Sequence, residues 1–254
     1  MKYSTRHLLF ALAFLCSSAP LQADEPEKTF VELVTEFFED VATYGKDNLK
    51  IIYTMCIHPN EVSAVAASSP WTGKSLVKYV TSDKPQRIWE VGFGPGNITR
   101  QIIKKKNAAT ALDGVELLEE FYTTALNELQ LSSDSNVSLN LCGAEDWVPR
   151  DYDGAPLYDT VISTLAFTTL PPEVCAGIIK KIARLLKPGG TFSFITYMLS
   201  RSLGYCKWNN EEREAYAKKI DAFDALLEED FRLVKTDKVF LNVPPTYIYH
   251  WVKK

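Results

Sequence analysis

The sequence predicts an α/β domain with a mostly parallel, seven-stranded sheet, an antiparallel last strand, and helices on both faces. Three observations lead to this prediction. Strand-like and helix-like patterns alternate from residue 87 onward, a glycine-rich turn joins the first strand to a helix, and a Val-Pro-Pro break separates the last two strands. Such alternation favours a parallel sheet covered on both faces. The 254 residues, 46% of them hydrophobic, are enough for one large domain with a full core.

Each expected element follows from its local pattern. The expected strands are Arg87–Val91, Thr110–Glu116, Val137–Cys142, Thr160–Ser163, Thr191–Tyr197, Phe231–Leu241 and Tyr247–Lys253. The expected helices run from Ser69 to about Val80 and over Ile98–Lys105, Glu119–Leu129, Pro172–Leu186 and Asn210–Leu227. The Lys-Pro-Gly-Gly segment Lys187–Gly190 predicts a helix stop and a turn. Pro244 and Pro245 predict that the last two strands form an antiparallel pair.

The first 23 residues are typical of a secretory signal peptide. They carry Lys2 and Arg6, then an apolar run from Leu8 to Cys16, then a tail of small residues. The apolar run is shorter than a membrane-spanning helix needs. We therefore expect a signal peptide at residues 1–23 and an exported or membrane-associated protein. An apolar N-terminus kept on a cytoplasmic protein is the alternative.

Residues 24–56 are expected to form an N-terminal helical extension. Within it, Phe30, Leu33, Phe37 and Val41 recur at helical spacing, with acidic residues on the other face. Helices that lie on membrane surfaces favour Lys and Arg on the polar face. The acidic face therefore favours a helix packed on the domain over a membrane-surface helix.

Charge and cysteine content narrow the class of site. A formal net charge of −4 disfavours nucleic-acid binding through bulk charge. The five cysteines are scattered without a CxxC pair, which disfavours a zinc site and a disulfide framework. We expect reduced thiols and no metal site. The cysteines are Cys16, Cys56, Cys142, Cys175 and Cys206.

The turn Gly92-Phe93-Gly94-Pro95-Gly96 lies where open α/β sheets bind their ligands, at the carboxyl end of a strand. A dinucleotide fingerprint GxGxxG would need a third glycine at the position of Asn97, and a phosphate-binding P-loop motif is absent. The turn therefore does not favour a pyrophosphate. Its backbone N–H groups and the positive end of the next helix suit a single carboxylate, such as that of an amino-acid moiety.

Glu116 ends the second expected strand, 20 residues beyond Gly96. An acidic residue at this distance binds ribose hydroxyls in related folds. An exposed carboxylate stabilised at a helix start is the other interpretation, and Asp113 is the second candidate for the ribose contact. A ligand with a carboxylate and a ribose but no required phosphate is indicated, and S-adenosylmethionine fits that description.

From about Ile57 to the C-terminus, the chain resembles class I S-adenosylmethionine-dependent methyltransferases, which have a Rossmann-like fold. Five segments in order carry the resemblance: "WEVGFGPGN", "VELLEEF", "CGAEDW", "YDTVISTLAFTTLPPEV" and "RLLKPGGTFSFITY". The resemblance implies a methyltransferase domain at residues 57–254 with S-adenosylmethionine as cofactor. The implied cofactor-binding residues are Glu90, Gly92, Gly94, Gly96, Asn97, Glu116, Leu117, Ala144, Glu145 and Ser163.

Within that superfamily, the chain is most similar to bacterial phospholipid N-methyltransferases. The segments "VSAVAASSPWTGKSLV", "LPPEV" and "LNVPPTYIYHWV" carry this similarity. It implies methylation of a phosphatidylethanolamine-like head-group amine, or a similar small amine, and membrane-surface association. Two departures bear on the substrate. Gly143 stands where the family often has an acid, and Ala166 where it often has proline.

Methyl transfer to an amine requires alignment of the reacting atoms and loss of a proton from the amine. Ser163, Phe167 and Tyr197 are the catalytic candidates because they lie at or near strand ends above the expected cofactor. An aromatic face also stabilises a cationic head group, although ordinary core packing is the alternative for both rings. His58 is a further candidate base, weighed against a structural role.

Two other function classes remain. The alternative enzyme is an rRNA adenine N6-dimethyltransferase, whose family carries an Asn-(Leu/Ile)-Pro-(Tyr/Phe) motif after the fourth strand. This sequence has "STLAF" there, with neither Asn nor Pro. A binding protein without activity is the third class, and the intact glycine turn with Glu116 disfavours it.

An export signal conflicts with a cofactor made in the cytosol unless the enzyme is tethered facing the cytosol or delivered into another cell's cytosol.

Overall fold

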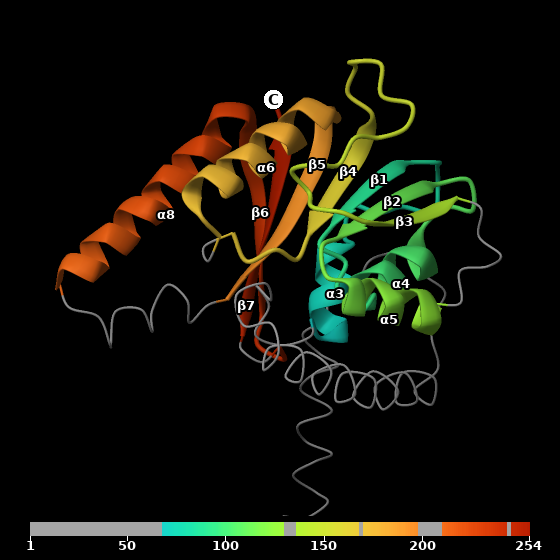
Figure 1. The fold of residues 1–254 in the computed structure, drawn as a ribbon, viewed down its shortest axis with the longest axis horizontal. Coiled ribbons are helices and arrows are strands. Elements are labelled where there is room, and N and C mark those ends of the chain that lie inside the picture. Colours follow the sequence, from blue (N-terminus) through green and yellow to red (C-terminus); the bar gives the residue numbers. More distant parts are fainter. Residues whose placement is uncertain (1–67, 130–135, 168–169, 198–209, 243–244) are drawn as a thin grey trace, which may run out of the picture. The chain divides into compact units, whose positions relative to one another are not determined.

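Seven strands form one sheet in the order β3-β2-β1-β4-β5-β7-β6 in a computed structural model (Figure 1). The structure describes residues 68–129, 136–167, 170–197, 210–242 and 245–254. They all belong to one compact unit, Asp40–Lys254. The strands are β1 (Arg87–Val91), β2 (Ala111–Glu116), β3 (Val137–Leu141), β4 (Tyr158–Ser163), β5 (Leu186–Tyr197), β6 (Phe231–Val239) and β7 (Thr246–Lys253).

The strand directions agree with the sequence prediction. Strands β1 to β5 pair in parallel, and β7 is antiparallel to both β5 and β6. Strand β6 therefore points the same way as β5, so the carboxyl ends of β1, β2, β4, β5 and β6 all lie at one edge of the sheet. This edge is called the carboxyl edge below.

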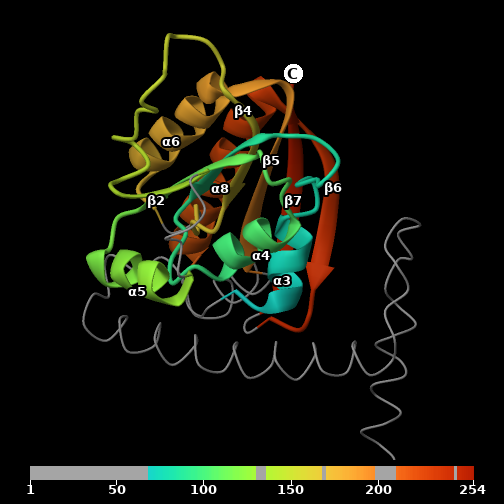
Figure 2. The same ribbon diagram turned by 90° about the vertical axis from the view of Figure 1, so that its right-hand side faces the viewer.

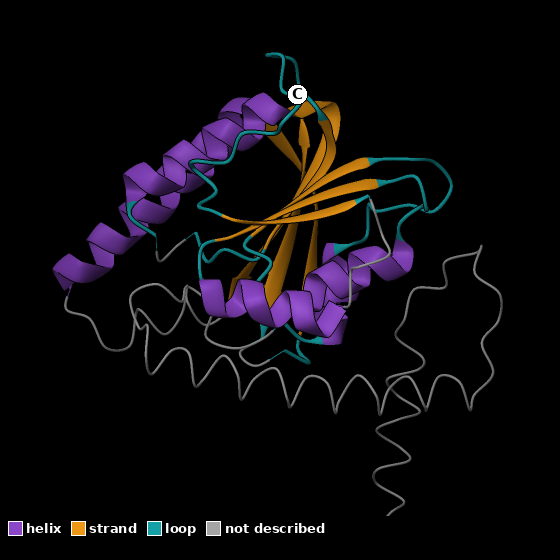
Figure 3. Cartoon of the chain, turned by 45° about the vertical axis from the view of Figure 1, so that its right-hand side comes forward, coloured by secondary structure: helices purple, strands orange, loops and turns teal. Residues whose placement is uncertain are grey.

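Helices cover both faces of the sheet, as Figure 3 shows. They are α3 (Pro70–Leu76), α4 (Asn97–Lys105), α5 (Glu119–Leu129), α6 (Pro172–Leu185) and α8 (Asn210–Asp230). None of the helices within the described ranges is long and apolar enough to cross a bilayer. The crossover from β3 to β4, residues 142–157, is a loop without a helix. The first part of this crossover, at the carboxyl edge, is held by the backbone bond from Cys142 N to the carbonyl of Glu116 and by side-chain contacts.

Two hydrophobic cores lie on opposite faces of the sheet because successive strand residues point to opposite sides. On β1, Trp89 packs in the core beneath α6 and α8, and Ile88 packs in the core beneath α3 and α4. Both side chains are fully buried. Burial of each such side chain contributes about 1.5–3 kcal/mol, so the alternation fixes which face of each strand meets which helices.

The segment Lys187–Gly190 differs from the predicted turn, because it lies inside β5. One residue lies between Tyr158 and Thr160 on β4, whereas four lie between their partners Leu186 and Thr191 on β5. The extra residues form a bulge, and Gly189 takes a φ of +76° there. The turn-forming residues thus bend the strand without ending it, and the strand begins directly after α6.

Helix α3 is shorter than predicted. It ends at Leu76, where Val80 was expected, and Val77 follows as its C-cap. The amides of Lys78 and Val80 then donate to the carbonyls of Ser75 and Val77 in a turn. This turn keeps both Val77 and Val80 buried in the core beneath α3.

A buried histidine joins the three strands at one side of the sheet. His250 on β7 is hydrogen-bonded to Ser193 Oγ on β5 at 2.8 Å and to Asp237 Oδ2 on β6 at 3.2 Å. Burial lowers the pKa of His250, and the nearby Asp237 partly opposes that change. The side-chain contacts therefore bind β7 to both neighbours in addition to the backbone ladder.

Candidate active site

The glycine turn at the end of β1 has a backbone that favours glycine at three positions. Gly92, Gly94 and Gly96 have φ values of +73°, +54° and +93°, a region where other residues are strained. The amides of Gly92 and Phe93 donate to the carbonyl of Val115 on β2, at 2.9 and 3.3 Å. The turn is therefore fixed against the neighbouring strand.

The three glycines differ in what surrounds them. A β carbon on Gly92 would meet Leu165 at 2.7 Å, and one on Gly96 would meet Leu129 at 3.0 Å. A β carbon on Gly94 would meet nothing within 4 Å. Gly92 and Gly96 thus allow close packing of the protein, whereas Gly94 leaves space in front of the turn for a ligand.

Glu116 at the end of β2 binds the turn through backbone amides. Its Oε2 accepts from Gly94 N at 2.8 Å, and its Oε1 accepts from the amides of Leu117 and Leu118 at 2.9 and 3.0 Å. The side chain is 8% exposed. Burial raises the pKa of Glu116, and the three amide donors partly offset this rise. An acidic side chain thus lies where the sequence predicted a ribose contact.

Glu90 on β1 is fully buried, and neither carboxylate oxygen has a hydrogen-bond partner among the described residues. Burial raises the pKa of Glu90 from 4.5 to about 8, and the charge of Glu116 adds to the rise. The hydroxyl and amide of Thr99 on α4 oppose it, although the Thr99 hydroxyl also lacks a hydrogen-bond partner. Such an orphaned acid suits a cation supplied by a ligand.

Asn97 begins α4 directly after the turn. Its Nδ2 donates to the carbonyl of Ser68 at 3.4 Å, and its buried Oδ1 has no partner among the described residues. The amide side chain therefore connects the glycine turn to the segment that precedes α3.

The loop after β3 contains the residues predicted to hold an adenine. Ala144 is buried and Glu145 is exposed, and Leu117 at the end of β2 has 60% of its surface exposed. Lys181 on α6 donates from Nζ to the carbonyls of Glu145 and Trp147. The exposed Leu117, beside a loop that Lys181 holds in place, offers a suitable surface for a flat apolar ring.

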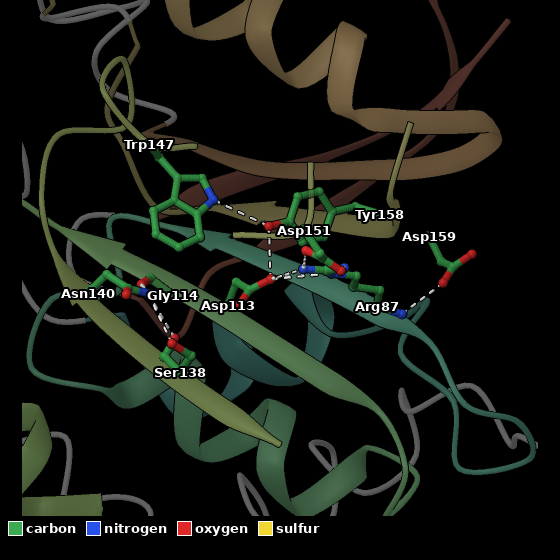
Figure 4. A network of polar contacts seen from close by, with 9 residues as sticks. All are labelled: Arg87, Asp113, Gly114, Ser138, Asn140, Trp147, Asp151, Tyr158 and Asp159. Carbon is green, nitrogen blue, oxygen red and sulfur yellow. Dashed lines mark hydrogen bonds and ion pairs between the residues drawn. The ribbon is translucent and has the colours of Figure 1, made fainter. Parts of the chain in front are cut away.

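A chain of polar contacts fixes the far end of this loop (Figure 4). Trp147 Nε1 donates to Tyr158 Oη at 3.3 Å, and Tyr158 Oη donates to Asp113 Oδ2 at 2.9 Å. Arg87 also donates to Asp113 and pairs with Asp151. Burial raises the pKa of Tyr158, so its hydroxyl stays protonated. Asp113, the second candidate for the ribose contact, is engaged in this chain of contacts.

The catalytic candidates occupy different environments. Ser163 is fully buried, and its Oγ accepts from Leu165 N at 3.2 Å. Phe167 packs against the rings of Phe192, Phe194 and Phe223 in the core. Tyr197 is the last residue of β5 and is partly buried. These placements do not test the catalytic roles, which stay predictions. His58 lies outside the described residues.

Several residues that shape the site escaped the sequence analysis. Thr164 donates from Oγ1 to the carbonyl of Gly92, and Leu165 packs against that glycine. Thr99 on α4 opposes the rise in the pKa of Glu90. Lys181 on α6 donates to the Trp147 carbonyl and so holds the loop after β3. Of these residues, only Thr164 carries a signal in the sequence, because it is a hydroxyl residue directly after a predicted strand.

The structure describes two of the five cysteines, Cys142 and Cys175. Cys142 is partly exposed and Cys175 is buried, and neither forms a disulfide. Among the residues outside the masked segments, no group of three or more His, Cys, Asp or Glu side chains could hold a metal ion.

Residues 88–190 match the sequence model of a family described as a methyltransferase domain. The chain carries a class I S-adenosylmethionine-dependent methyltransferase domain. The methyltransferase domain has the expected seven-stranded fold. It is similar to the N-methyltransferase NodS from Bradyrhizobium japonicum in complex with S-adenosyl-L-homocysteine, with a TM-score of 0.53 and 12% identity, over 71% of this chain and 85% of the solved one.

Two curated relatives resemble the methyltransferase domain in sequence. An ornithine lipid N-methyltransferase from Singulisphaera acidiphila is 24% identical over 148 residues, which cover 56% of this chain and 73% of the relative. A malonyl-[acyl-carrier protein] O-methyltransferase from Halalkalibacterium halodurans is 31% identical over 117 residues, which cover 45% of this chain and 40% of the relative. One relative is named for an N-methylation and the other for an O-methylation, so these similarities leave the methyl acceptor open.

The described residues fit S-adenosylmethionine, the cofactor of this methyltransferase domain. Glu90 offers a buried carboxylate without a partner among the described residues, the space before Gly94 admits a ligand, and Glu116 lies where the sequence predicts a ribose contact. When bound, the cofactor supplies a methyl group already activated on a positively charged sulfur.

Proposed function

We propose that this methyltransferase acts on the amine of a lipid head group, such as phosphatidylethanolamine or a similar amine. The observation that carries the proposal is the similarity to a lipid N-methyltransferase over 73% of that relative's length. The second relative, named for a carboxyl-type acceptor on a carrier protein, is covered over 40% of its length. The longer alignment therefore favours a lipid amine as the acceptor.

The proposed roles of the cofactor-binding residues follow from their surroundings. Glu90 pairs with the ammonium group of the cofactor, which supplies the partner that the fold does not. Glu116 uses one of its four acceptor positions for a ribose hydroxyl, since backbone amides occupy three. Leu117 and the segment Ala144–Glu145 contact the adenine ring.

The proposed acceptor side lies at the ends of β4 and β5. Ser163 keeps its hydroxyl proton for donation because its oxygen already accepts the Leu165 amide. Tyr197 presents a ring to the head group, where a developing positive charge gains from a cation–π contact. Phe167 supports this region from the core. The arrangement orients the amine, and water takes its proton.

The domain boundaries and the location of the protein also stay proposals. We assign the methyltransferase domain to residues 57–254, a helical extension to 24–56 and a signal peptide to 1–23, all three of which include segments outside the described residues. Export or membrane association follows if the signal is functional, and a cytoplasmic protein follows if it is retained. The mass of the mature protein distinguishes the two.

A labelled-methyl transfer assay tests the proposed function. The full chain is incubated with labelled S-adenosylmethionine and, separately, with extracted lipids, RNA and total protein. We expect label in amine-bearing lipids. Label in RNA alone, as for an adenine dimethyltransferase, would reject the lipid proposal.

The glycines provide a matched pair of controls for this assay. Gly94 and Gly154 both have positive φ values, +54° and +102°, and a β carbon on either would meet nothing within 4 Å. Gly94→Ala places a methyl group in the proposed cofactor space and should abolish transfer. Gly154→Ala carries comparable backbone strain in an exposed loop and should leave transfer intact.

A further inference from the structure

The turn after β6 exposes two large apolar side chains. Phe240 has 70% of its surface exposed and Leu241 has 41%. Because β6 runs parallel to β1, β4 and β5, its end lies at the carboxyl edge, together with the glycine turn, Ser163 and Tyr197. Figure 2 shows β6 ending beside α3. The exposed pair therefore lies on the side of the domain that binds the cofactor.

Buried polar contacts fix this turn to the start of α3. Asn242 is 1% exposed, and its Oδ1 accepts from Ser69 N at 2.8 Å and from Thr72 Oγ1 at 3.0 Å. Thr246 Oγ1 lies 3.5 Å from Thr72 Oγ1. With Asn242 held inward by these contacts, Phe240 and Leu241 are directed outward on a fixed backbone.

The same contacts connect the turn to the cofactor site. Asn97, at the end of the glycine turn, donates to the carbonyl of Ser68, and the next residue, Ser69, donates to Asn242. Three side-chain and backbone steps thus join the glycine turn to the exposed pair. A surface bound by Phe240 and Leu241 would therefore lie at the same carboxyl edge as the glycine turn.

The charge around the turn is opposite in sign to that of the whole chain. Residues 70–80 and 234–242 contain four lysines and a single acid, Asp237, whereas the chain has a net charge of −4. Asp237 is paired with Lys78, Lys235 and His250. Lys238 is two residues before Phe240 and lies 6.0 Å from the Tyr247 ring centre. The four lysines are Lys74, Lys78, Lys235 and Lys238.

We infer that the turn after β6, residues Phe240–Asn242, docks on an anionic lipid bilayer, with Phe240 and Leu241 in the acyl region and the lysines facing the head groups. Exposed apolar residues combined with basic residues are the signature of binding at a membrane interface. Nucleic acid would use the lysines but has no need of an exposed leucine. The inference rests on the proposed function, since it gives a lipid substrate a route to the site.

Vesicle sedimentation of the full chain, without cofactor, tests the inference. The probes are vesicles of phosphatidylcholine with 30% phosphatidylglycerol and vesicles of phosphatidylcholine alone. We expect stronger binding to the anionic vesicles, reduced at least about tenfold by the double change Phe240→Asp and Leu241→Asp, since two apolar side chains leave the bilayer. Lys238→Glu should weaken binding by about fivefold or more, given the contribution of each basic residue near the surface.

Matched variants separate docking from a general loss of apolar surface. Leu126→Asp removes an exposed leucine of α5, 39% exposed, and should leave vesicle binding unchanged. Phe240→Trp should retain binding, and brominated lipid should quench its fluorescence beyond that of the wild type. Undiminished binding of the double variant would overturn the inference. So would a lysine-dependent affinity for RNA that exceeds the affinity for vesicles.

The experiment also distinguishes docking from the proposed substrate. If Phe240-dependent vesicle binding occurs but label never enters lipid, the docking surface stands and the lipid substrate is rejected. If label enters lipid equally for the wild type and the double variant on vesicles, the substrate stands and the docking surface is rejected. On short-chain lipid amines below their aggregation threshold, both proteins should be equally active.

Discussion

Glu90 and Glu116 lie on adjacent strands at the same edge of the sheet, yet they differ in their hydrogen-bond partners. Glu116 accepts three backbone amides, whereas Glu90 has no hydrogen-bond partner among the described residues. Both are buried: Glu116 is 8% exposed and Glu90 is 0% exposed. Burial raises the pKa of both acids, and that of Glu90 reaches about 8.

The difference indicates separate purposes for the two acids. Glu116 stabilises the glycine turn through Gly94 whether or not a ligand is present, so it contributes to both the fold and the site. Glu90 destabilises the free protein when ionised, because a buried charge without partners is unfavourable. A cationic ligand group bound beside Glu90 would remove this destabilisation. Changes at the two positions should therefore have opposite effects on stability.

The largest expected effect is on the pH dependence of stability and comes from Glu90→Gln. The pKa of Glu90 rises from 4.5 to about 8 on folding, so the folded state holds a proton that the unfolded state releases. The free energy of unfolding therefore falls as pH rises from about 4.5 to 8, by an amount on the order of a few kcal/mol. Glutamine does not titrate, so the variant should be more stable than wild type at pH 8.

Denaturant unfolding of the free chain at pH 5 and pH 8.5 checks this prediction. The quantity compared is the change in unfolding free energy between the two pH values, for the wild type and for Glu90→Gln. Groups that do not interact with Glu90 contribute equally to both proteins, so they cancel in the difference. Parallel pH profiles would show that Glu90 already has a partner, and the contrast with Glu116 would fail.

The next effect in size is on cofactor affinity and comes from Glu116→Ala. Loss of a charged hydrogen-bonding group weakens binding by about 1–3 kcal/mol, which is roughly 5- to 150-fold in Kd. The amide of Gly94 also loses its acceptor, so the variant should be less stable, opposite to Glu90→Gln. Calorimetric titration with S-adenosylmethionine measures the affinity. An unchanged Kd would assign the ribose contact to another residue.

The smallest effect is expected from Thr99→Val, which probes the surroundings of Glu90. The buried Thr99 hydroxyl has no hydrogen-bond partner among the described residues, so its removal should stabilise the free protein by up to about 1 kcal/mol. It should also raise the pKa of Glu90 slightly, because that hydroxyl opposes the rise. The midpoint of the pH–stability profile reports that change.

Thr110→Val is the matched control for this prediction. Thr110 is as buried as Thr99, but its Oγ1 accepts from Gln86 N at 3.0 Å. The control should lower the free energy of unfolding, since it leaves a backbone amide without its acceptor. A loss of stability in Thr99→Val equal to that of the control would mean that the Thr99 hydroxyl has a partner.

The fold could be predicted from the sequence because local patterns determine most of it. Period-two and period-3.6 spacing located every described strand and helix, and the glycine turn with its distance to Glu116 placed both at one sheet edge. The segment around Gly189 was correctly predicted to stop the helix, but its bulge was predicted as a turn, since a Lys-Pro-Gly-Gly sequence is compatible with either. Its partner strand decides the outcome, and that pairing is not local.

The surroundings of the site could not be predicted for the same reason. Arg87, Asp113 and Tyr158 meet across three strands, and Lys181 reaches the Trp147 carbonyl from 34 residues away. No spacing rule encodes such contacts. The ionisation of Glu90 likewise depends on its complete burial and on the nearby charge of Glu116, which the sequence does not show for a single acid in an apolar strand.

The position of β7 has a consequence for how the protein is made. This strand pairs with β5 on one side and β6 on the other, although both precede it in the chain. While a ribosome is still synthesising residues 246–253, β6 has no neighbour in the sheet to pair with. A growing chain therefore holds its sheet open at β5 until those residues emerge, and a premature stop just before Thr246 would leave β6 detached.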